Sequence, residues 1–247
     1  DDAAANDLED ILNKKNLKSW GLIRDSKRKT TLKERITTLT QQICRVDYEM
    51  NEKISKDLAK KVLASFSDIA QNHPALIIED YSKGMITEEM VTDLIAVSRE
   101  QKKLIVVDPG KKTNPLFYKG VDLLKPNFME AKLMVEALGF FGLQDVKEIC
   151  QRLSEKLNLR YVVVTLGPKG MALFERERQS YHLIPTVAPE VYDVSGAGDT
   201  AVSVLTASLL TGADLIEAAW MSNCAAGVVV GQYGTATVSK KELIEFY

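Results

Sequence analysis

The stretch Leu104-Ile105-Val106-Val107 is a short, continuous apolar run, and Asp108-Pro109 follows it directly. Runs of the same kind recur at residues 75–78, 121–124 and 161–165, with segments of helical apolar spacing between them. Strands that are apolar on both faces and alternate with helices are typical of a parallel sheet covered on both sides. The pattern therefore predicts an α/β fold with a mostly parallel central sheet.

Helices and further strands are expected around these runs. Apolar residues fall at helical spacing near 8–12, 54–69, 90–97, 131–138, 146–157, 199–210, 215–230 and 239–246. The β-branched residues of 35–48 favour extended structure, and the stretches 171–174 and 181–187 are expected to be antiparallel strands. We expect one domain over residues 1–247.

Composition limits the class of protein. The 247 residues are 45% hydrophobic, which is enough for one sizeable core. With 32 basic and 34 acidic residues, the formal net charge is −2, which argues against a surface dedicated to nucleic acid or to an anionic membrane. No apolar run is long enough for a transmembrane helix, and the acidic start at Asp1 is unlike a signal peptide. A soluble, cytoplasmic protein is expected.

Cysteine and histidine offer no catalytic or metal-binding pattern. Cys44, Cys150 and Cys224 are far apart and lack CxxC spacing, so they are expected to be buried thiols in a reducing compartment. The two histidines, His73 and His182, have no neighbours at metal-ligand spacing. A histidine-based metal site and a Ser-His-Asp triad are therefore not expected.

Polar residues follow the predicted strands at the points where they end. They are Glu79-Asp80-Tyr81, Asp108, Asn127 with Glu130, and Gly167 with Gly170. Each alone is explained equally well as a turn or a helix cap. Because ligands bind beyond the carboxyl ends of strands in open α/β sheets, the four groups together predict a site at this edge.

The most specific element is Asp193-Val-Ser-Gly-Ala-Gly-Asp199-Thr200, which leads into an apolar helix. Gly196 and Gly198 permit a backbone anion nest, and the helix start adds free N–H groups that suit a phosphate. Asp199 would lie in the first helical turn and could accept a hydroxyl proton, as a kinase base must. The alternative is an ordinary helix start whose aspartate complements the dipole.

Two other nucleotide-binding motifs fit the chain poorly. Residues 196–201 also match the loose GxGxxA dinucleotide pattern, but the acidic residue at the required spacing, Glu217, lies in a predicted helix and not at a strand end. A Walker A loop is absent from the sequence. A kinase with this sequence would need to hold phosphate by another device.

Several motifs resemble those of the ribokinase-like (PfkB) carbohydrate kinases. DVSGAGDT at 193–200 resembles the family's C-terminal signature, KPNFMEAK at 125–132 its NxxE element, TLGPKG at 165–170 its nucleotide loop, and SNCAAG at 222–227 its adenine pocket. The resemblance implies a three-layer α/β sandwich and an ATP-dependent carbohydrate kinase that uses Mg²⁺. It assigns an anion hole to Gly196, Ala197 and Gly198, the base to Asp199, Mg²⁺ support through water to Asn127 and Glu130, and nucleotide contacts to Thr165, Gly167, Gly170, Asn223 and Gly227.

Within this family, the chain is most similar to the heptose kinases of lipopolysaccharide biosynthesis, including the kinase domains of heptose kinase/adenylyltransferases. The similarity lies in residues 37–49, 79–86, 189–200 and 223–239. It implies phosphorylation of D-glycero-D-manno-heptose 7-phosphate at O1 to the 1,7-bisphosphate, on the route to ADP-heptose. The alternatives are a PfkB kinase for another sugar or nucleoside, and a non-catalytic sensor of nucleotide or sugar phosphate.

The resemblance also bears on the substrate side of the site and on the chain's extent. Asp80, Lys83, Arg45 and Asp108 are candidates for binding the sugar phosphate, although solvated loop residues or a turn explain them as well. The segment 35–48 would be the family's lid and could carry a homodimer contact. Residues 229–237 resemble a loop that holds a monovalent cation in relatives, which leaves K⁺ activation open. The family's N-terminal sugar-binding strands are expected to be missing here, and a separate adenylyltransferase is expected.

Overall fold

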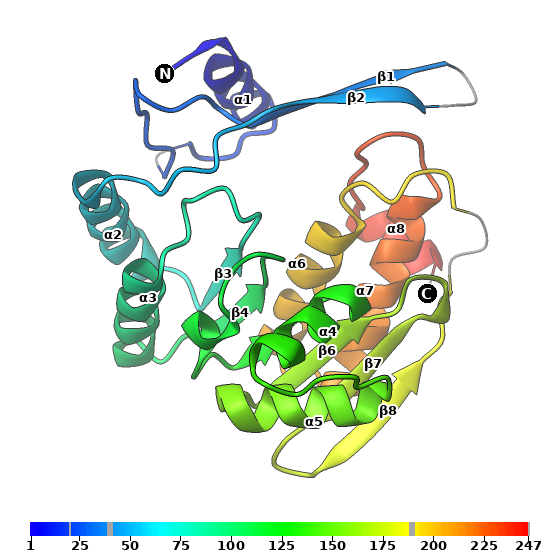
Figure 1. The fold of residues 1–247 in the computed structure, drawn as a ribbon. Coiled ribbons are helices and arrows are strands. Elements are labelled where there is room, and N and C mark those ends of the chain that lie inside the picture. The colour runs from blue at the N-terminus through cyan, green and yellow to red at the C-terminus, as the bar shows by residue number, and fades with distance from the viewer. Residues whose placement is uncertain (20, 39–41, 188–190, 247) are drawn as a thin grey trace. The chain divides into compact units, whose positions relative to one another are not determined.

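The structure is a computed structural model that describes residues 1–19, 21–38, 42–187 and 191–246. The chain forms two compact units, which are described separately (Figure 1). The first unit holds residues 1–72 and 82–93, and the second holds residues 73–81 and 94–247. Helix α3, Glu88–Glu100, has residues in both.

The first unit contains two complete helices, the first residues of α3 and a two-stranded ribbon. Helix α1 (Ala3–Lys14) begins at Asp2, whose side chain accepts a hydrogen bond from the amide of Ala5, and helix α2 (Lys56–Ala70) is capped in the same way by Ser55. Strands β1 (Leu32–Thr37) and β2 (Gln42–Tyr48) pair antiparallel, as Figure 1 shows. The extended segment expected at 35–48 thus forms this ribbon, while its residues 39–41 lie outside the described residues.

One expectation about cysteine is wrong. Cys150 and Cys224 are buried thiols, as expected, but Cys44 is exposed. The reason is that Cys44 lies on β2, which belongs to a two-stranded ribbon and not to a sheet packed between helical layers.

The second unit is built on a six-stranded sheet in the order β3-β4-β5-β6-β7-β8. Its strands are β3 (Ala75–Glu79), β4 (Leu104–Asp108), β5 (Leu123–Leu124), β6 (Tyr161–Thr165), β7 (Met171–Glu175) and β8 (Ser180–Ile184). Strands β3 to β6 are parallel, whereas β7 and β8 are antiparallel to their preceding neighbours. The predicted mostly parallel sheet is confirmed.

Helices cover both faces of this sheet. Each crossover from β3 to β6 adds the next strand on the same side, so right-handed connections place the intervening helices on one face. These include α4 (Phe128–Ala137) and α5 (Val146–Leu157), which lie in front of the sheet in Figure 1. Helices α6 (Ala197–Leu210) and α7 (Leu215–Val230) pack on the other face. The result is a three-layer sandwich.

The core between the sheet and α6–α7 fixes the start of α6. Val106, Leu123 and Val163 project from neighbouring strands and pack with Ala201 and Leu205 of α6, all with no more than 2% exposure. Alanine lets the helix approach the sheet closely, and burying this apolar surface holds the helix in place. The amino end of α6 is therefore held above the carboxyl ends of the strands.

The start of helix α7 argues against the dinucleotide-binding alternative. Asp214 and Glu217 form a capping box, in which each side chain accepts a hydrogen bond from the other residue's amide. Glu217 thus has a structural role at a helix start, as its sequence context indicated. The last helix, α8 (Lys240–Phe246), follows α7. Within the described part of the chain, every helix is too short or too polar to cross a membrane.

Candidate active site

The carboxyl ends of the parallel strands bring the predicted polar groups to one edge of the sheet. Glu79 ends β3, Asp108 ends β4 and Thr165 ends β6. Asn127 follows β5 and forms an isolated parallel bridge with Thr165, which continues the strand alignment. The prediction that these groups share one edge is confirmed by this geometry.

The start of α6 has the geometry expected of an anion nest. Gly196 is the N-cap of α6 and has φ of 80°, a left-handed conformation that favours glycine. Among the described residues, no side chain accepts a hydrogen bond from the first amides of this helix. A Cβ on Gly198 would lie 3.7 Å from Oδ2 of Asp108, so the glycine brings the backbone close to the strand ends. Exposed N–H groups at a helix start create a site of positive potential for phosphate oxygens.

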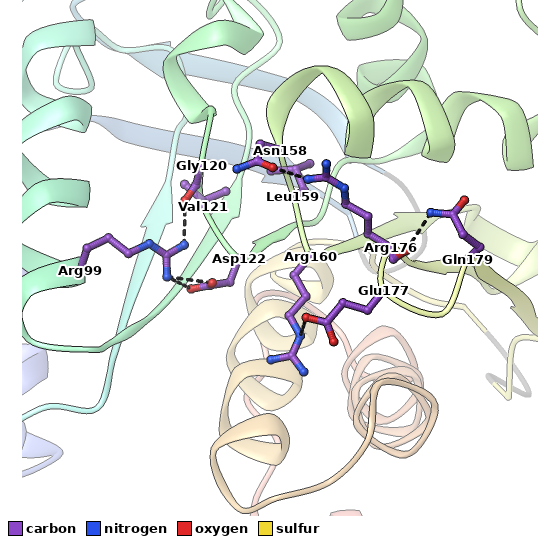
Figure 2. Close-up of a pocket in the computed structure, with 10 residues that line it drawn as sticks. All are labelled: Arg99, Gly120, Val121, Asp122, Asn158, Leu159, Arg160, Arg176, Glu177 and Gln179. Atoms are coloured by element: carbon purple, nitrogen blue, oxygen red, sulfur yellow. Dashed lines mark hydrogen bonds and ion pairs between the residues drawn. The ribbon is translucent and has the colours of Figure 1, made fainter.

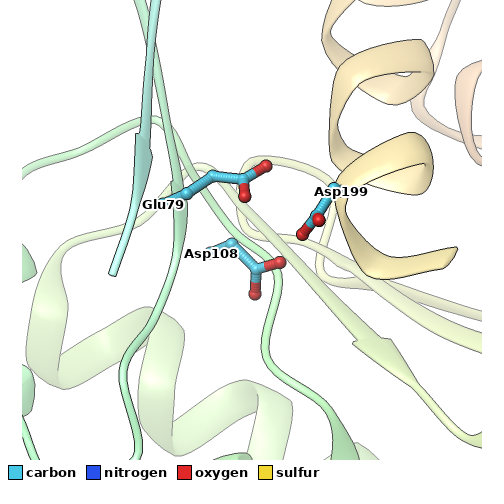
Figure 3. Close-up of side chains that lie close together, drawn as sticks. All are labelled: Glu79, Asp108 and Asp199. Atoms are coloured by element: carbon cyan, nitrogen blue, oxygen red, sulfur yellow. The ribbon is translucent and has the colours of Figure 1, made fainter. Parts of the chain in front are cut away.

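Asp199 lies in the first turn of α6 and forms a cluster with two strand-end carboxylates. One carboxylate oxygen each from Glu79, Asp108 and Asp199 lies within 4.8 Å of the others (Figure 3). The hydroxyl of Tyr81 donates a hydrogen bond of 2.7 Å to Oδ1 of Asp199 and lies 3.3 Å from Oε2 of Glu79. Sequence reasoning named Asp199 and Asp108 but did not assign a role to Glu79 or Tyr81.

A buried lysine balances part of this negative charge. Nζ of Lys125 lies 2.8 Å from Oδ2 of Asp108, and the side chain of Lys125 is only 3% exposed. Burial raises the pKa of Asp108, while the lysine acts in the opposite direction. Burial, followed by the charge of Asp199 and its hydrogen bond, raises the pKa of Glu79 to about 7. The cluster therefore holds a carboxyl group that titrates near neutral pH.

Register explains why Glu79, and not Asp80, joins the cluster. Glu79 pairs with Asp108 across β3 and β4, so the two side chains project from the same face of the sheet. The next residue, Asp80, is buried, and its carboxylate accepts hydrogen bonds from Thr113 and, at 2.7 Å, from Tyr118. The role of Asp80 in sugar binding stays a prediction.

The residues predicted for Mg²⁺ support form a helix cap. Oδ1 of Asn127 accepts a hydrogen bond of 2.9 Å from the amide of Glu130, and Oε2 of Glu130 accepts one of 2.9 Å from the amide of Asn127. This capping box starts α4 and explains both residues structurally. Their role toward a metal stays a prediction.

Three of the predicted nucleotide-binding positions, one in the nucleotide loop and two in the adenine pocket, lie next to the segment 184–187. A Cβ on Gly170, whose φ is 89°, would lie 1.9 Å from the carbonyl oxygen of Ile184, so only glycine fits there. Nδ2 of Asn223 donates a hydrogen bond of 2.7 Å to the carbonyl of Pro185. A Cβ on Gly227 would lie 3.5 Å from the Val187 side chain and closer still to the Phe246 ring. Gly167 starts a 3-10 turn just after Thr165. Nucleotide contacts at these positions stay predictions.

The predicted basic contacts for the sugar phosphate lie in the first unit. Nζ of Lys83 is 2.5 Å from Oε1 of Glu49, and Nε of Arg45 is 2.8 Å from Oδ1 of Asp47. Both cations are thus already paired with carboxylates of the same unit. Their contact with substrate stays a prediction.

A pocket at the opposite edge of the sheet has a different character (Figure 2). It lies where β5 and β6 begin and where β7 ends, away from the polar strand ends. Its arginines are held by neighbours: Arg99 by Asp122, Arg176 by Asn158 and Arg160 by Glu177. These contacts hold the arginines within the loops of this edge. The predicted polar groups lie at the other edge, so the carboxyl-end cluster is the candidate active site.

Comparison with known proteins identifies relatives of the whole chain. Residues 1–242 match the family described as pfkB family carbohydrate kinase. The chain is 37% identical over 227 residues to the bifunctional protein HldE of Geobacter metallireducens, covering 91% of this chain and 45% of that protein. It is 34% identical to HldE of Aliarcobacter butzleri, covering 100% of this chain and 51% of that protein. The chain thus spans about half the length of the curated relatives it matches.

Solved structures of carbohydrate kinases share this fold. Ribokinase of Thermotoga maritima aligns with a TM-score of 0.76 and 19% identity over 100% of this chain and 78% of that one. Phosphofructokinase-2 of Escherichia coli, in complex with potassium, aligns with a TM-score of 0.69 and 21% identity over 82% of this chain and 65% of that one. The expected ribokinase-like α/β fold is confirmed.

Proposed function

The chain belongs to the pfkB family of carbohydrate kinases, and we propose that it transfers the γ-phosphoryl group of ATP to O1 of D-glycero-D-manno-heptose 7-phosphate. The kinase activity rests on the observation that Asp199 lies at the glycine-capped start of α6, beside the strand-end carboxylates. The acceptor rests on the resemblance of four stretches to heptose kinases. The same resemblance supports the proposal that the product enters the route to ADP-heptose.

In the proposed reaction, Asp199 takes the proton of the acceptor hydroxyl. The hydroxyl oxygen then bonds to the γ-phosphorus while the bond from that phosphorus to the β–γ bridging oxygen breaks, and ADP leaves. The amides at Gly196, Ala197 and Gly198 would hold the phosphoryl oxygens, where the helix start favours negative charge. Positioning of the two reactants supplies much of the remaining rate enhancement.

The family implies Mg²⁺, and the residues present fit a water-mediated role. The amide oxygen of Asn127 and the carboxylate of Glu130 are oxygen donors at the strand edge, and the cap uses only one carboxylate oxygen of Glu130. Mg²⁺ keeps several water ligands, which matches support through water by such groups. Mg²⁺ held there would neutralise negative charge on the phosphates.

The finer contacts are also proposals. We assign nucleotide binding to Thr165, Gly167, Gly170, Asn223 and Gly227, and sugar-phosphate binding to Asp80, Asp108, Lys83 and Arg45. Activation by K⁺ through residues 229–237 is supported by the potassium complex of phosphofructokinase-2, and equal activity with and without K⁺ would remove it. Alanine variants that leave sugar-phosphate affinity unchanged would remove the substrate assignments.

We further assign a homodimer contact to the ribbon of β1 and β2. The register pairs Leu32 with Tyr48 and Ile36 with Cys44, so these side chains share one face, and all four are exposed. Exposed Val46 lies on the same face, opposite Glu34. A largely apolar exposed face of this kind is typical of an interaction surface. Light scattering of the protein and of Ile36→Lys would decide, since a monomer in both cases contradicts the assignment.

The activity is tested with an ADP-coupled assay that compares heptose 7-phosphate with fructose 6-phosphate, ribose and adenosine. We expect turnover with the heptose phosphate and a loss of about 10²- to 10⁴-fold in Asp199→Asn, the usual effect of removing a general base. Asp57→Asn is the matched control, because Asp57 is also an exposed aspartate in a first helical turn. Turnover with another acceptor would replace the substrate, and normal turnover of Asp199→Asn would refute the base.

A further inference from the structure

Asp199 is held by a side chain that contributes little to packing. Tyr81 is 57% exposed, yet its hydroxyl donates a hydrogen bond of 2.7 Å to Oδ1 of Asp199. Tyr81 follows β3 after Asp80, and 118 residues separate it from Asp199 in the sequence. Because most of the ring lies outside the core, the contacts that distinguish this tyrosine from phenylalanine are those of its hydroxyl with the carboxylates of Asp199 and Glu79.

Glu79 faces the same carboxylate from the end of β3. The charged and titratable groups around Glu79 are Asp199 of α6, Asp108 of β4 and Tyr81, and Lys125 forms an ion pair with Asp108. If all three carboxyls were ionised, one lysine would face three negative charges in a partly buried site. Two neighbouring carboxylates lower this repulsion by sharing a proton.

We propose that Glu79 and Tyr81 are positioning residues for Asp199, and that Glu79 and Asp199 share one proton whose release makes Asp199 available as a base. This inference rests on the proposed role of Asp199. With the proton present, the Glu79 carboxyl donates a hydrogen bond to Asp199 and occupies an oxygen that the acceptor hydroxyl needs. When the proton leaves to solvent, Tyr81 still holds Oδ1, and Oδ2 is free to take the proton of the acceptor hydroxyl.

The electrostatics of the site agree with this arrangement. Burial is the first cause that raises the pKa of Glu79 to about 7, and the charge of Asp199 and the hydrogen bond to it are the next two. The Glu79 carboxyl would therefore release its proton in the range where a kinase works. The pair, and not either residue alone, determines the acid side of the pH dependence.

The kinetic test is the pH profile of kcat/KM between pH 5 and 9. For the unaltered protein we expect an acid limb with its midpoint near 7, so activity at pH 6 should be about one-tenth of the plateau. Glu79→Gln should move the midpoint down by about one pH unit or more, and Tyr81→Phe should lower kcat about tenfold with little change in KM. Glu155→Gln, which alters an exposed carboxylate on α5, should leave the profile unchanged. An acid limb that does not move in Glu79→Gln would overturn the proposal.

A second measurement does not depend on catalysis. The carboxyl carbon of Glu79 can be followed by NMR in the whole chain labelled with ¹³C-glutamate, with Glu79→Gln identifying its signal. We expect a titration midpoint near 7 that falls by at least one pH unit in Asp199→Asn. An ordinary glutamate midpoint that Asp199→Asn leaves in place would refute the shared proton. If no acceptor is turned over but the NMR shift is present, the kinase assignment fails and the carboxyl pair stands.

Discussion

Replacing Lys125 with methionine tests how the carboxylate cluster is kept in the folded protein. Methionine has a similar length but no charge, so Lys125→Met leaves Asp108 beside Asp199 and Glu79 without its cation. The lysine side chain is 3% exposed and the Asp108 side chain 20% exposed, and Nζ lies 2.8 Å from Oδ2. The pair is therefore largely buried, and the loss of one partner leaves a carboxylate with little solvent to stabilise it.

Removing one partner from a buried ion pair costs about 3–5 kcal/mol of unfolding free energy. Because Asp108 keeps some contact with solvent, we expect a cost somewhat below this range, about 2–3 kcal/mol at pH 8. The cost should shrink as the pH falls. Burial already raises the pKa of Asp108 and Lys125 opposes that shift, so without Lys125 the folded state binds a proton more tightly than the unfolded chain.

The assay is urea unfolding at pH 8 and pH 5.5, followed by circular dichroism. The variants are Lys125→Met, Asp108→Asn and the double variant, with Lys147→Met as an exposed lysine control on α5. The double variant should regain about 2 kcal/mol relative to the sum of the single losses, because the unpaired charge is gone. An equal loss at both pH values, together with additive single effects, would show that the pair does not stabilise the fold as argued.

Two further predictions concern single positions near the site. Gly170→Ala should lower the unfolding free energy by about 2–4 kcal/mol, because its Cβ would lie 1.9 Å from the Ile184 carbonyl. Gly120 has a similar φ of 86° but open space around it. Gly120→Ala should therefore lower the unfolding free energy only by the backbone strain, about 1–2 kcal/mol, in the same urea experiment. Equal losses would refute the clash. Glu79→Gln should raise the free energy of unfolding at pH 8 by about 1 kcal/mol after allowing for solvent screening. The reason is that the pKa of Glu79 is raised from 4.5 to about 7 in the folded protein. Ionisation of Glu79 therefore destabilises the fold as the pH rises from 4.5 to 7. Thermal unfolding should show the gain vanish near pH 4.5, and a gain that is constant with pH would contradict it.

Much of the fold follows from local sequence patterns. The apolar runs at 75–78, 104–107 and 161–165 became β3, β4 and β6, and helical spacing gave α5 and α7 at their observed bounds. The middle residues of β4 and β6 are buried on both faces, so their continuously apolar composition distinguishes these strands from loops. The strand predicted at 121–124 is longer than the observed one, because only Leu123 and Leu124 pair as β5.

The site was harder to predict from the sequence, because it depends on strand register and on contacts between segments that are distant in the sequence. Glu79-Asp80-Tyr81 offers three polar side chains, and only the pairing of Glu79 with Asp108 shows which carboxylate faces α6. In the sequence, nothing distinguishes Lys125 from a surface lysine. Only the structure shows that it forms an ion pair with Asp108. The position of Asp199 was predictable because glycines and a helix start mark it locally.

The cluster is costly for folding and is therefore informative about function. Two of its carboxyls, Glu79 and Asp108, have pKa values raised chiefly by burial, so each destabilises the folded state when it ionises. A fold selected only for stability would replace one of these groups with an amide or an apolar residue. Here they surround Asp199, and the start of α6 offers the positive potential that partly offsets their charge. Like charges gathered at the edge where an α/β sheet binds its ligands are best explained by a reaction that needs a base there.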